Sequence, residues 1–194
     1  HYWLTASAQA VFGENEFSAR FFPALAALGG IAVAWTLARS MFGRETALYS
    51  AAILSTSLAY FALSRINITD MTLGFFVTLS LAGFWLGHNR GRRYYLLLYG
   101  GAALAVLTKG LIGFVLPGGV IFCYMVLSRQ WDIFRSALYL PGIILFAVLT
   151  VPWFLAVCLV NRDFFYFFFI QEHFLRYATK MHGRYEPAWF FIPI

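Results

Sequence analysis

Apolar residues run along this chain in long blocks that are separated by short polar segments. A transmembrane helix needs about 20 consecutive, mostly apolar residues. Six blocks come close to or reach that length: residues 21–38, 46–63, 71–87, 94–108, 111–127 and 139–160. A seventh block begins near Ala188. The pattern therefore predicts an all-α, polytopic membrane protein with about six spans and the start of a seventh.

The stretch from residue 94 to residue 127 contains only one charged residue, Lys109. As a single helix it would run about 51 Å at a rise of about 1.5 Å per residue, far beyond a hydrocarbon core of about 30 Å. We expect it to break at "TKG", residues 108–110, which places Lys109 in a slightly recessed position on a tight turn between two helices.

Composition supports the same class, because 61% of the residues are hydrophobic and only 11% are charged. An average soluble domain is about 45–50% apolar and about 25% charged. The formal net charge is +6, but no polar segment combines a Lys/Arg stripe with interleaved aromatic residues. We therefore assign the positive charge to loop asymmetry and to contact with membrane lipid, and expect no nucleic-acid partner.

Six crossings sort the connecting segments onto two sides. The first side holds residues 39–45, 88–93 and 128–137. The second side holds residues 1–20, 64–70, 109–110 and 161–187. Each side carries seven Lys or Arg residues, but the first side packs them into shorter loops with two acidic residues, against six on the second. Because positive charge is enriched in short cytoplasmic loops, the first side is predicted to be cytoplasmic.

These segments suggest one domain, of which residues 1–194 form a part. Residues 1–20 are predicted to lie externally at the interface, with Tyr2, Trp3 and Phe12 at headgroup level. Residues 21–160 hold the six spans, residues 161–187 form an external loop, and residues 188–194 begin the next span. The chain starts at His1 without Met and ends inside an apolar run, so we expect a fragment that is cut at both ends.

Asp70, in "SRINITDMTLGFF", lies at the junction of two spans on the external side. One interpretation is an interfacial ion pair with Arg65 that ends two helices. The other is a carboxylate at the mouth of a cavity, which accepts a proton or binds a cation, because ionisable residues at membrane depth are costly and often functional. Arg65 itself is a weaker candidate for the site.

Lys109, in "LAVLTKGLIGFVLPG", is predicted to lie on the same side as Asp70. A Lys at this depth could simply extend its ammonium group to the interface. Alternatively, a recessed ammonium followed by Gly110 forms a seat for a phosphate, since the glycine lets an anion approach the backbone and the lysine supplies a point charge.

The segment "QEHFLRYATKMHGRYEP", residues 171–187, holds five of the 22 charged residues and two of the four histidines of the chain. Glu172 and His173 could contribute ligands to a divalent metal, although two ligands alone make a weak site. Arg176, three residues after His173, shares one helical face with it. His182 and Arg184 are weaker candidates. The alternative is a solvated amphipathic loop over the membrane. All candidates fall on one side, so this loop is predicted to roof a cavity with Asp70 and Lys109 at its floor.

Four stretches carry a resemblance to a known family: "HYWLTASAQAVFGENEFSARFFPAL", "ITDMTLGFF", "LTKGLIGFVLPG" and "EHFLRY…RYEPAWFFIPI". In this order and spacing they resemble the bacterial protein-mannosyltransferase-like glycosyltransferases, which include the aminoarabinose transferases that modify lipid A. The resemblance covers nearly the whole chain. Members usually carry a Lys-Pro-Pro-like motif just before the stretch that begins here at "HYW", so part of the active site is expected upstream.

The resemblance implies a GT-C fold with an active site on the periplasmic face of the inner membrane. It implies an inverting glycosyltransferase that moves a sugar from a polyprenyl-phosphate donor to a lipid, glycan or protein acceptor. Lys109 and Arg176 would then bind the donor phosphate, whose negative charge grows as the sugar leaves, and Asp70 would act as the base or orient the acceptor.

Two other classes remain open. In a transporter or lipid flippase, Arg65, Asp70 and Lys109 would line a substrate path. Broken spans in inverted halves would favour this class, and the sequence shows no such symmetry. A membrane scaffold without catalytic activity would keep only the fold.

Overall fold

The computed structural model describes residues 1–168, and in that range it contains helices and no strand. The helices are α1 (Tyr2–Phe12), α2 (Glu16–Phe42), α3 (Arg44–Thr56), α4 (Leu58–Arg65), α5 (Thr69–Asn89), α6 (Tyr95–Lys109), α7 (Ile112–Ser128), α8 (Asp132–Ala137) and α9 (Leu140–Val160). A short 3₁₀ helix, Arg92–Tyr94, precedes α6. The α-helical prediction is confirmed.

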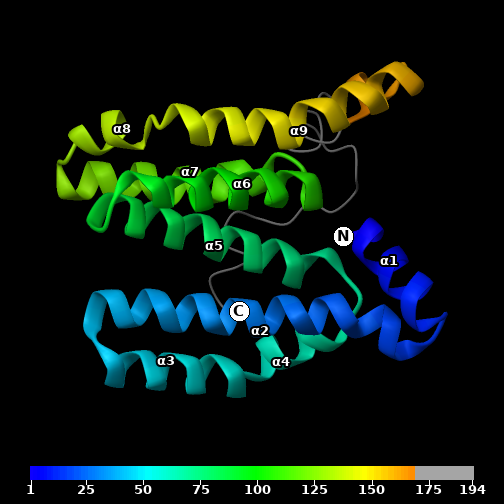
Figure 1. Ribbon diagram of the computed structural model, residues 1–194, viewed down its shortest axis with the longest axis horizontal. Helices are drawn as coiled ribbons and strands as arrows, with labels where there is room; N and C mark the ends of the chain where they lie inside the picture. The colour runs from blue at the N-terminus through cyan, green and yellow to red at the C-terminus, as the bar shows by residue number, and fades with distance from the viewer. Residues whose placement is uncertain (169–194) are drawn as a thin grey trace, which may run out of the picture. The chain divides into compact units, whose positions relative to one another are not determined.

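The chain divides into two compact units, His1–Thr150 and the residues from Val151 onward. In the first unit, α2 packs between α5 and the α3–α4 pair, and α5 packs against α6, which packs against α7 (Figure 1). The second unit begins within α9, and its described part holds Phe154 against Phe164, with the ring centroids 6.5 Å apart.

Each of the six apolar blocks is helical, but three single helices are long and apolar enough to cross a membrane by length and composition, and the bent α3–α4 pair would make a fourth. The number of crossings therefore stays a prediction. The expected break at "TKG" is confirmed, because α6 ends at Lys109 and Gly110 has φ 78°, a value that favours glycine.

The block at residues 46–63 is not one straight span. It bends by 59° between α3 and α4, where Ser57 has extended backbone angles of φ −63° and ψ 122°. The preceding Ser55 and Thr56 hydroxyls both donate to the Ala52 carbonyl, at 2.9 and 2.8 Å. Such side-chain bonds compete with helical hydrogen bonds and can accompany a bend. The hydrophobic pattern carries no signal for this bend.

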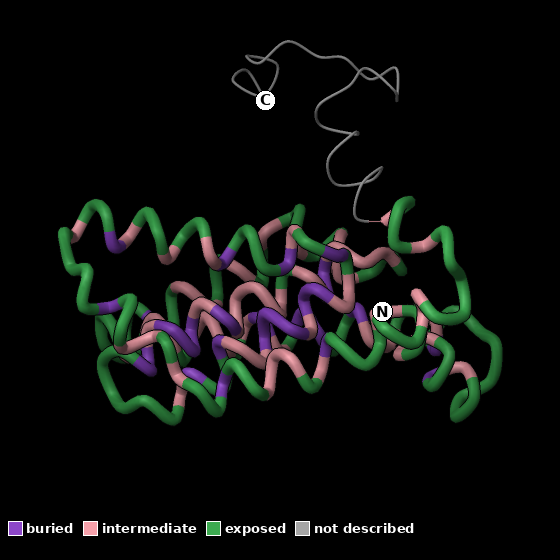
Figure 2. The backbone as a smooth tube through the Cα atoms, turned by 90° about the horizontal axis from the view of Figure 1, so that it is seen from above, coloured by how far each residue is buried: buried purple, intermediate pink, exposed green. Residues whose placement is uncertain are grey.

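Buried residues gather along α5 and α6 in the interior of the first unit, while its outer helix faces are largely exposed (Figure 2). Large apolar side chains on these faces, such as Leu28 and Phe122, are more than half exposed. An aqueous protein rarely exposes so large an apolar area. The arrangement fits a bundle that is surrounded by lipid.

Small residues allow α5 and α6 to approach closely. A Cβ added at Gly83 would meet the Leu98 backbone nitrogen, and it would lie 2.6 Å from the Leu97 carbonyl carbon. The Ser80 hydroxyl, which is fully buried on α5, donates to the Leu98 carbonyl at 2.9 Å. Close contact through small residues, with a hydrogen bond across the helices, is a common way of joining membrane helices.

Replacement of Gly83 by Ala is expected to destabilise this contact by about 1–3 kcal/mol, the usual cost of overpacking. The added methyl group meets backbone atoms of α6, which cannot rotate away as a flexible side chain can. Gly74→Ala on the same helix is the control, because a Cβ there meets nothing within 4 Å. Thermal unfolding of the purified complete protein in detergent measures the difference, and equal midpoints for the two variants would contradict this packing.

Two local contacts fix the start of α2 and the position of α4 beside it. Asn15 caps α2, because its side chain accepts from the Ser18 amide and the Ser18 hydroxyl oxygen accepts from the Asn15 amide. Tyr60 of α4 donates to the Ala27 carbonyl of α2 at 2.7 Å. The first contact fixes the start of α2, and the second holds α4 against α2.

Candidate functional site at the ends of α5 and α6

Asp70 and Lys109 come together although 39 positions separate them in the chain. The Lys109 Nζ donates to the Asp70 Oδ1, and both side chains are about half exposed, at 47% and 44%. Asp70 stands in the first turn of α5, and Lys109 is the last residue of α6. The antiparallel packing of these two helices brings the charges to one end of the first unit (Figure 1).

Each charge lies at the helix end that stabilises it. The N-terminus of a helix carries partial positive charge and favours a carboxylate, whereas the C-terminus favours a cation. The α6 helix stops at Lys109 because Gly110 adopts a positive φ and its amide closes onto the Val106 carbonyl at 2.8 Å. The local sequence therefore sets the position of the ammonium group.

The alternative pairing of Asp70 with Arg65 is wrong. The described residues contain two ion pairs, Asp70 with Lys109 and Glu16 with Arg20. The Arg65 guanidinium carbon instead lies 4.7 Å from the centroid of the Phe61 ring, in a cation–π arrangement. The weaker candidate Arg65 is therefore not a direct partner of Asp70.

His1 is a neighbour of this site that the sequence analysis missed. Its Nδ1 lies 3.1 Å from the Thr72 Oγ1, and its Nε2 lies 2.9 Å from the Asn67 Oδ1. The Thr5 hydroxyl donates weakly to the same Asn67 oxygen, at 3.4 Å. With Asn67 Oδ1 as acceptor, Nε2 of a neutral imidazole donates, and Nδ1 accepts from the Thr72 hydroxyl.

This small network fastens the start of α1 to the two sides of Asp70, since Asn67 precedes it and Thr72 follows it. Thr72 is only 2% exposed. No spacing in the sequence links a residue at position 1 to positions 67 and 72. The only feature of the sequence that could have drawn attention to His1 is the rarity of histidine, which occurs four times in the chain.

An apolar cavity of about 350 Å³ adjoins the network through Thr72. Its walls come from α1, α2 and α5, and its other lining residues are Leu4, Phe22, Leu25, Ala26, Gly29, Phe75 and Phe76. One end of the unit thus combines a cation, a carboxylate, an imidazole and an apolar cavity. This combination is suited to an amphipathic anion, with charge held at Lys109 and apolar groups held between helices.

The remaining candidates, Glu172, His173, Arg176, His182 and Arg184, lie outside the described residues. The predicted roof over Asp70 and Lys109 therefore stays a prediction, as does the expected metal. Among residues 1–168, no group of three or more His, Cys, Asp or Glu side chains could hold a metal ion.

Comparison with known proteins gives one matching family over most of the chain. Residues 1–155 match the family described as dolichyl-phosphate-mannose-protein mannosyltransferase. A Pseudomonas aeruginosa protein named undecaprenyl phosphate-alpha-4-amino-4-deoxy-L-arabinose arabinosyl transferase is 33% identical over 201 residues, covering 100% of this chain and 36% of the relative. An uncharacterized protein of Aquifex aeolicus is 35% identical over 193 residues, covering 98% of this chain and 38% of the relative.

Two solved structures share the fold. The crystal structure of ArnT from Cupriavidus metallidurans bound to undecaprenyl phosphate has a TM-score of 0.92 at 33% identity, covering 98% of this chain and 36% of that one. The apo structure of the same protein has a TM-score of 0.88 at 32% identity, covering 98% and 35%. The chain thus spans little more than a third of the length of these proteins.

Proposed function

Because the chain belongs to the dolichyl-phosphate-mannose-protein mannosyltransferase family, we propose that it is part of a membrane glycosyltransferase that uses a polyprenyl-phosphate-linked sugar as donor. The observation that carries the proposal is the ion pair between Asp70 and Lys109, which lies at one end of the first unit. The neighbouring apolar cavity adds room for part of a lipid.

The family and fold on which this proposal rests agree with the sequence analysis. The resemblance to protein-mannosyltransferase-like and aminoarabinose-transferase-like proteins is confirmed. The all-α fold of GT-C type is confirmed by structural likeness at 33% identity. The chain is therefore an integral membrane protein. Its orientation and the number of its crossings stay predictions.

Lys109 is proposed to bind the donor phosphate. A lysine ammonium carries three N–H donors, and the contact with Asp70 uses one of them. The remaining donors are available to phosphate oxygens at the tip of α6, where about half of the side chain is exposed. As the bond from phosphate to sugar breaks, negative charge grows on the phosphate, and a fixed cation then stabilises the transition state. Arg176 is proposed as a second cation for the same group.

Asp70 is proposed to orient the acceptor and to take its proton. Its carboxylate can accept a hydrogen bond from the attacking hydroxyl group of the acceptor and take the proton as the bond from the sugar to the donor phosphate breaks. An attack from the side opposite the leaving phosphate would invert the configuration at the sugar carbon. The His1 network fixes the backbone on both sides of Asp70, which keeps the carboxylate where a proton can be transferred.

The first donor to test is undecaprenyl phosphate linked to 4-amino-4-deoxy-arabinose. The Pseudomonas aeruginosa relative is named for this donor, and the Cupriavidus metallidurans structure is bound to undecaprenyl phosphate. A lipid acceptor is proposed, since acceptor and donor would then meet at the same membrane surface.

The proposal is tested with the purified complete protein, a labelled donor of this kind and lipid A as acceptor. Sugar on the acceptor together with release of undecaprenyl phosphate is the expected result. Movement of intact donor across vesicle membranes without transfer would favour a flippase instead. Neither transfer nor transport with any polyprenyl-phosphate sugar would leave only a scaffold role and would contradict the proposal.

Orientation gives a separate prediction. Position 91, in the short loop between α5 and α6, is expected in the cytoplasm, and position 180 is expected in the periplasm with the active site. In intact cells, an impermeant thiol reagent should label Lys180→Cys but not Gly91→Cys, each in a cysteine-free background. Permeabilised cells, in which both positions react, provide the control. The opposite labelling pattern would overturn the topology.

A further inference from the structure

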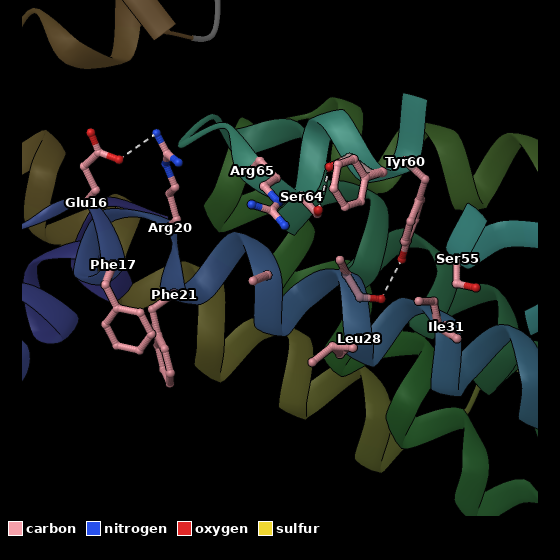
Figure 3. A pocket seen from close by; sticks show the side chains of 13 residues that line it. Glu16, Phe17, Arg20, Phe21, Leu28, Ile31, Ser55, Tyr60, Ser64 and Arg65 are labelled. Carbon is pink, nitrogen blue, oxygen red and sulfur yellow. Dashed lines mark hydrogen bonds and ion pairs between the residues drawn. The ribbon is translucent and has the colours of Figure 1, made fainter. Parts of the chain in front are cut away.

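A second and larger cavity lies on another face of α2. It has a volume of about 620 Å³ and lies between α2 and the bent α3–α4 pair, as Figure 3 shows from close by. Most of its lining side chains are apolar, among them Phe17, Phe21, Leu28 and Ile31. None of its lining residues belongs to the Asp70–Lys109 pair or to the His1 network.

We call this cavity between α2 and the α3–α4 pair the groove. Charged groups gather at one end of it. Glu16 and Arg20 of α2 form an ion pair at 3.1 Å, and Arg65 of α4 lies near them, as Figure 3 shows. The Arg65 guanidinium group lies over the Phe61 ring and makes no ion pair with a carboxylate of the described residues. Two cations and one anion leave the groove mouth with one unmatched positive charge.

We propose that this groove binds one phospholipid of the surrounding membrane, with an anionic headgroup such as phosphatidylglycerol. Its acyl chain would lie between α2 and the α3–α4 pair, and its phosphate would contact Arg65. The cavity volume falls within the range of about 300–1,000 Å³ that is usual for ligand pockets. A planar guanidinium group pairs well with phosphate oxygens, and its ring contact with Phe61 holds it at the groove mouth.

The bend at Ser57 contributes to the shape of the groove. Ser55, just before the bend, and Tyr60, Phe61 and Ser64, just after it, all line the cavity. Tyr60 donates to the Ala27 carbonyl and so holds α4 onto α2 beside the groove. The groove therefore has one open apolar length and one polar mouth, which matches the two parts of a phospholipid. This inference does not rest on the proposed transferase activity.

Photo-crosslinking tests the proposal. The complete protein is reconstituted in phosphatidylcholine vesicles that contain a phosphatidylglycerol with a diazirine in its acyl chain, and crosslinked peptides are mapped by mass spectrometry. Crosslinks are expected on α2 and α4. Unlabelled phosphatidylglycerol should compete about five-fold better than phosphatidylcholine, the effect of one basic side chain on an anionic lipid.

Two pairs of variants isolate the groove and its charge. Arg65→Gln should remove the five-fold preference, whereas Arg39→Gln should keep it, because Arg39 has a similar ring contact with Trp35, at 5.1 Å, but lies at the other end of α2. Ala24→Phe fills the groove from an exposed position and should lower the crosslinking. Ala32→Phe, which is also exposed on α2 but is not among the lining residues, should not.

Several results would overturn the proposal. Absence of crosslinks on α2 and α4 would mean that another segment of the complete protein covers the groove. Equal competition by the two phospholipids, or equal effects of Arg65→Gln and Arg39→Gln, would exclude recognition of the headgroup charge. Stronger competition by undecaprenyl phosphate than by phosphatidylglycerol would assign the groove to the donor.

Discussion

Replacing Asp70 by Asn is expected to lower the turnover of sugar transfer by about 10²–10⁴-fold, the usual contribution of a positioned general base. The amide keeps the size of the carboxylate but loses its charge and its basicity. The side chain is 44% exposed, so its loss should disturb the packing of α5 little. The purified variant, assayed at saturating donor and acceptor, gives the turnover per folded molecule.

Asp132→Asn is the matched control for this measurement. Asp132 also stands in the first turn of a helix, but α8 lies at the opposite end of the first unit (Figure 1). The control should retain wild-type turnover. If Asp70→Asn matched it, the carboxylate would have no part in the chemistry and would serve only to hold Lys109.

Replacing Lys109 by Ala is expected to weaken use of the donor by about 10- to 150-fold, the range for loss of a hydrogen bond to a charged group. The loss should appear as a raised KM for the donor and also as a lower kcat, because the phosphate gains charge in the transition state. Initial rates measured over a range of donor concentrations separate the two effects.

Arg90→Ala, which removes an exposed cation from the opposite end of the first unit, is the control for Lys109→Ala. It should leave both KM and kcat unchanged.

Arg176→Ala should act in the same direction as Lys109→Ala. If both residues bind one phosphate, the loss of free energy in the double variant should be smaller than the sum of the losses in the two single variants. Wild-type kinetics for Lys109→Ala at every donor concentration would contradict its assignment to the phosphate.

The sequence predicted the helices better than their shapes. Hydrophobic block length located α2, α5, α6, α7 and α9 and treated α3 and α4 as one helix. The excess length of residues 94–127 located the break at Lys109. Block length missed the bend at Ser57, because a hydrophobic pattern records which residues are apolar and not the direction that the backbone takes between them. The short α8 was missed for a related reason, since six residues are too few for a visible period.

The site was predicted in part. Topology placed Asp70 and Lys109 on one side, and the structure adds that they are in direct contact. The sequence offered Arg65 as the partner of Asp70 because it is five positions away. Distance along the chain was a poor guide here, since the α5–α6 packing brings Lys109 closer. His1 was missed because its contacts depend on how α1 folds back onto the loop before α5.

One measurement tests the central claim, that Asp70 and Lys109 act in transfer and do not merely join α5 to α6. The two charges are exchanged in the double variant Asp70→Lys with Lys109→Asp, and turnover is assayed on folded protein. The attraction between the side chains is restored. Each charge then stands at the less favourable helix end, which costs about 0.3–1 kcal/mol per site, so unfolding is expected slightly below the wild-type temperature but above that of either single variant. Transfer is predicted to stay at least about 100-fold below wild type, because the base and the phosphate cation have changed places. Recovery of wild-type transfer in the exchanged variant would show that only the attraction matters and would contradict the account.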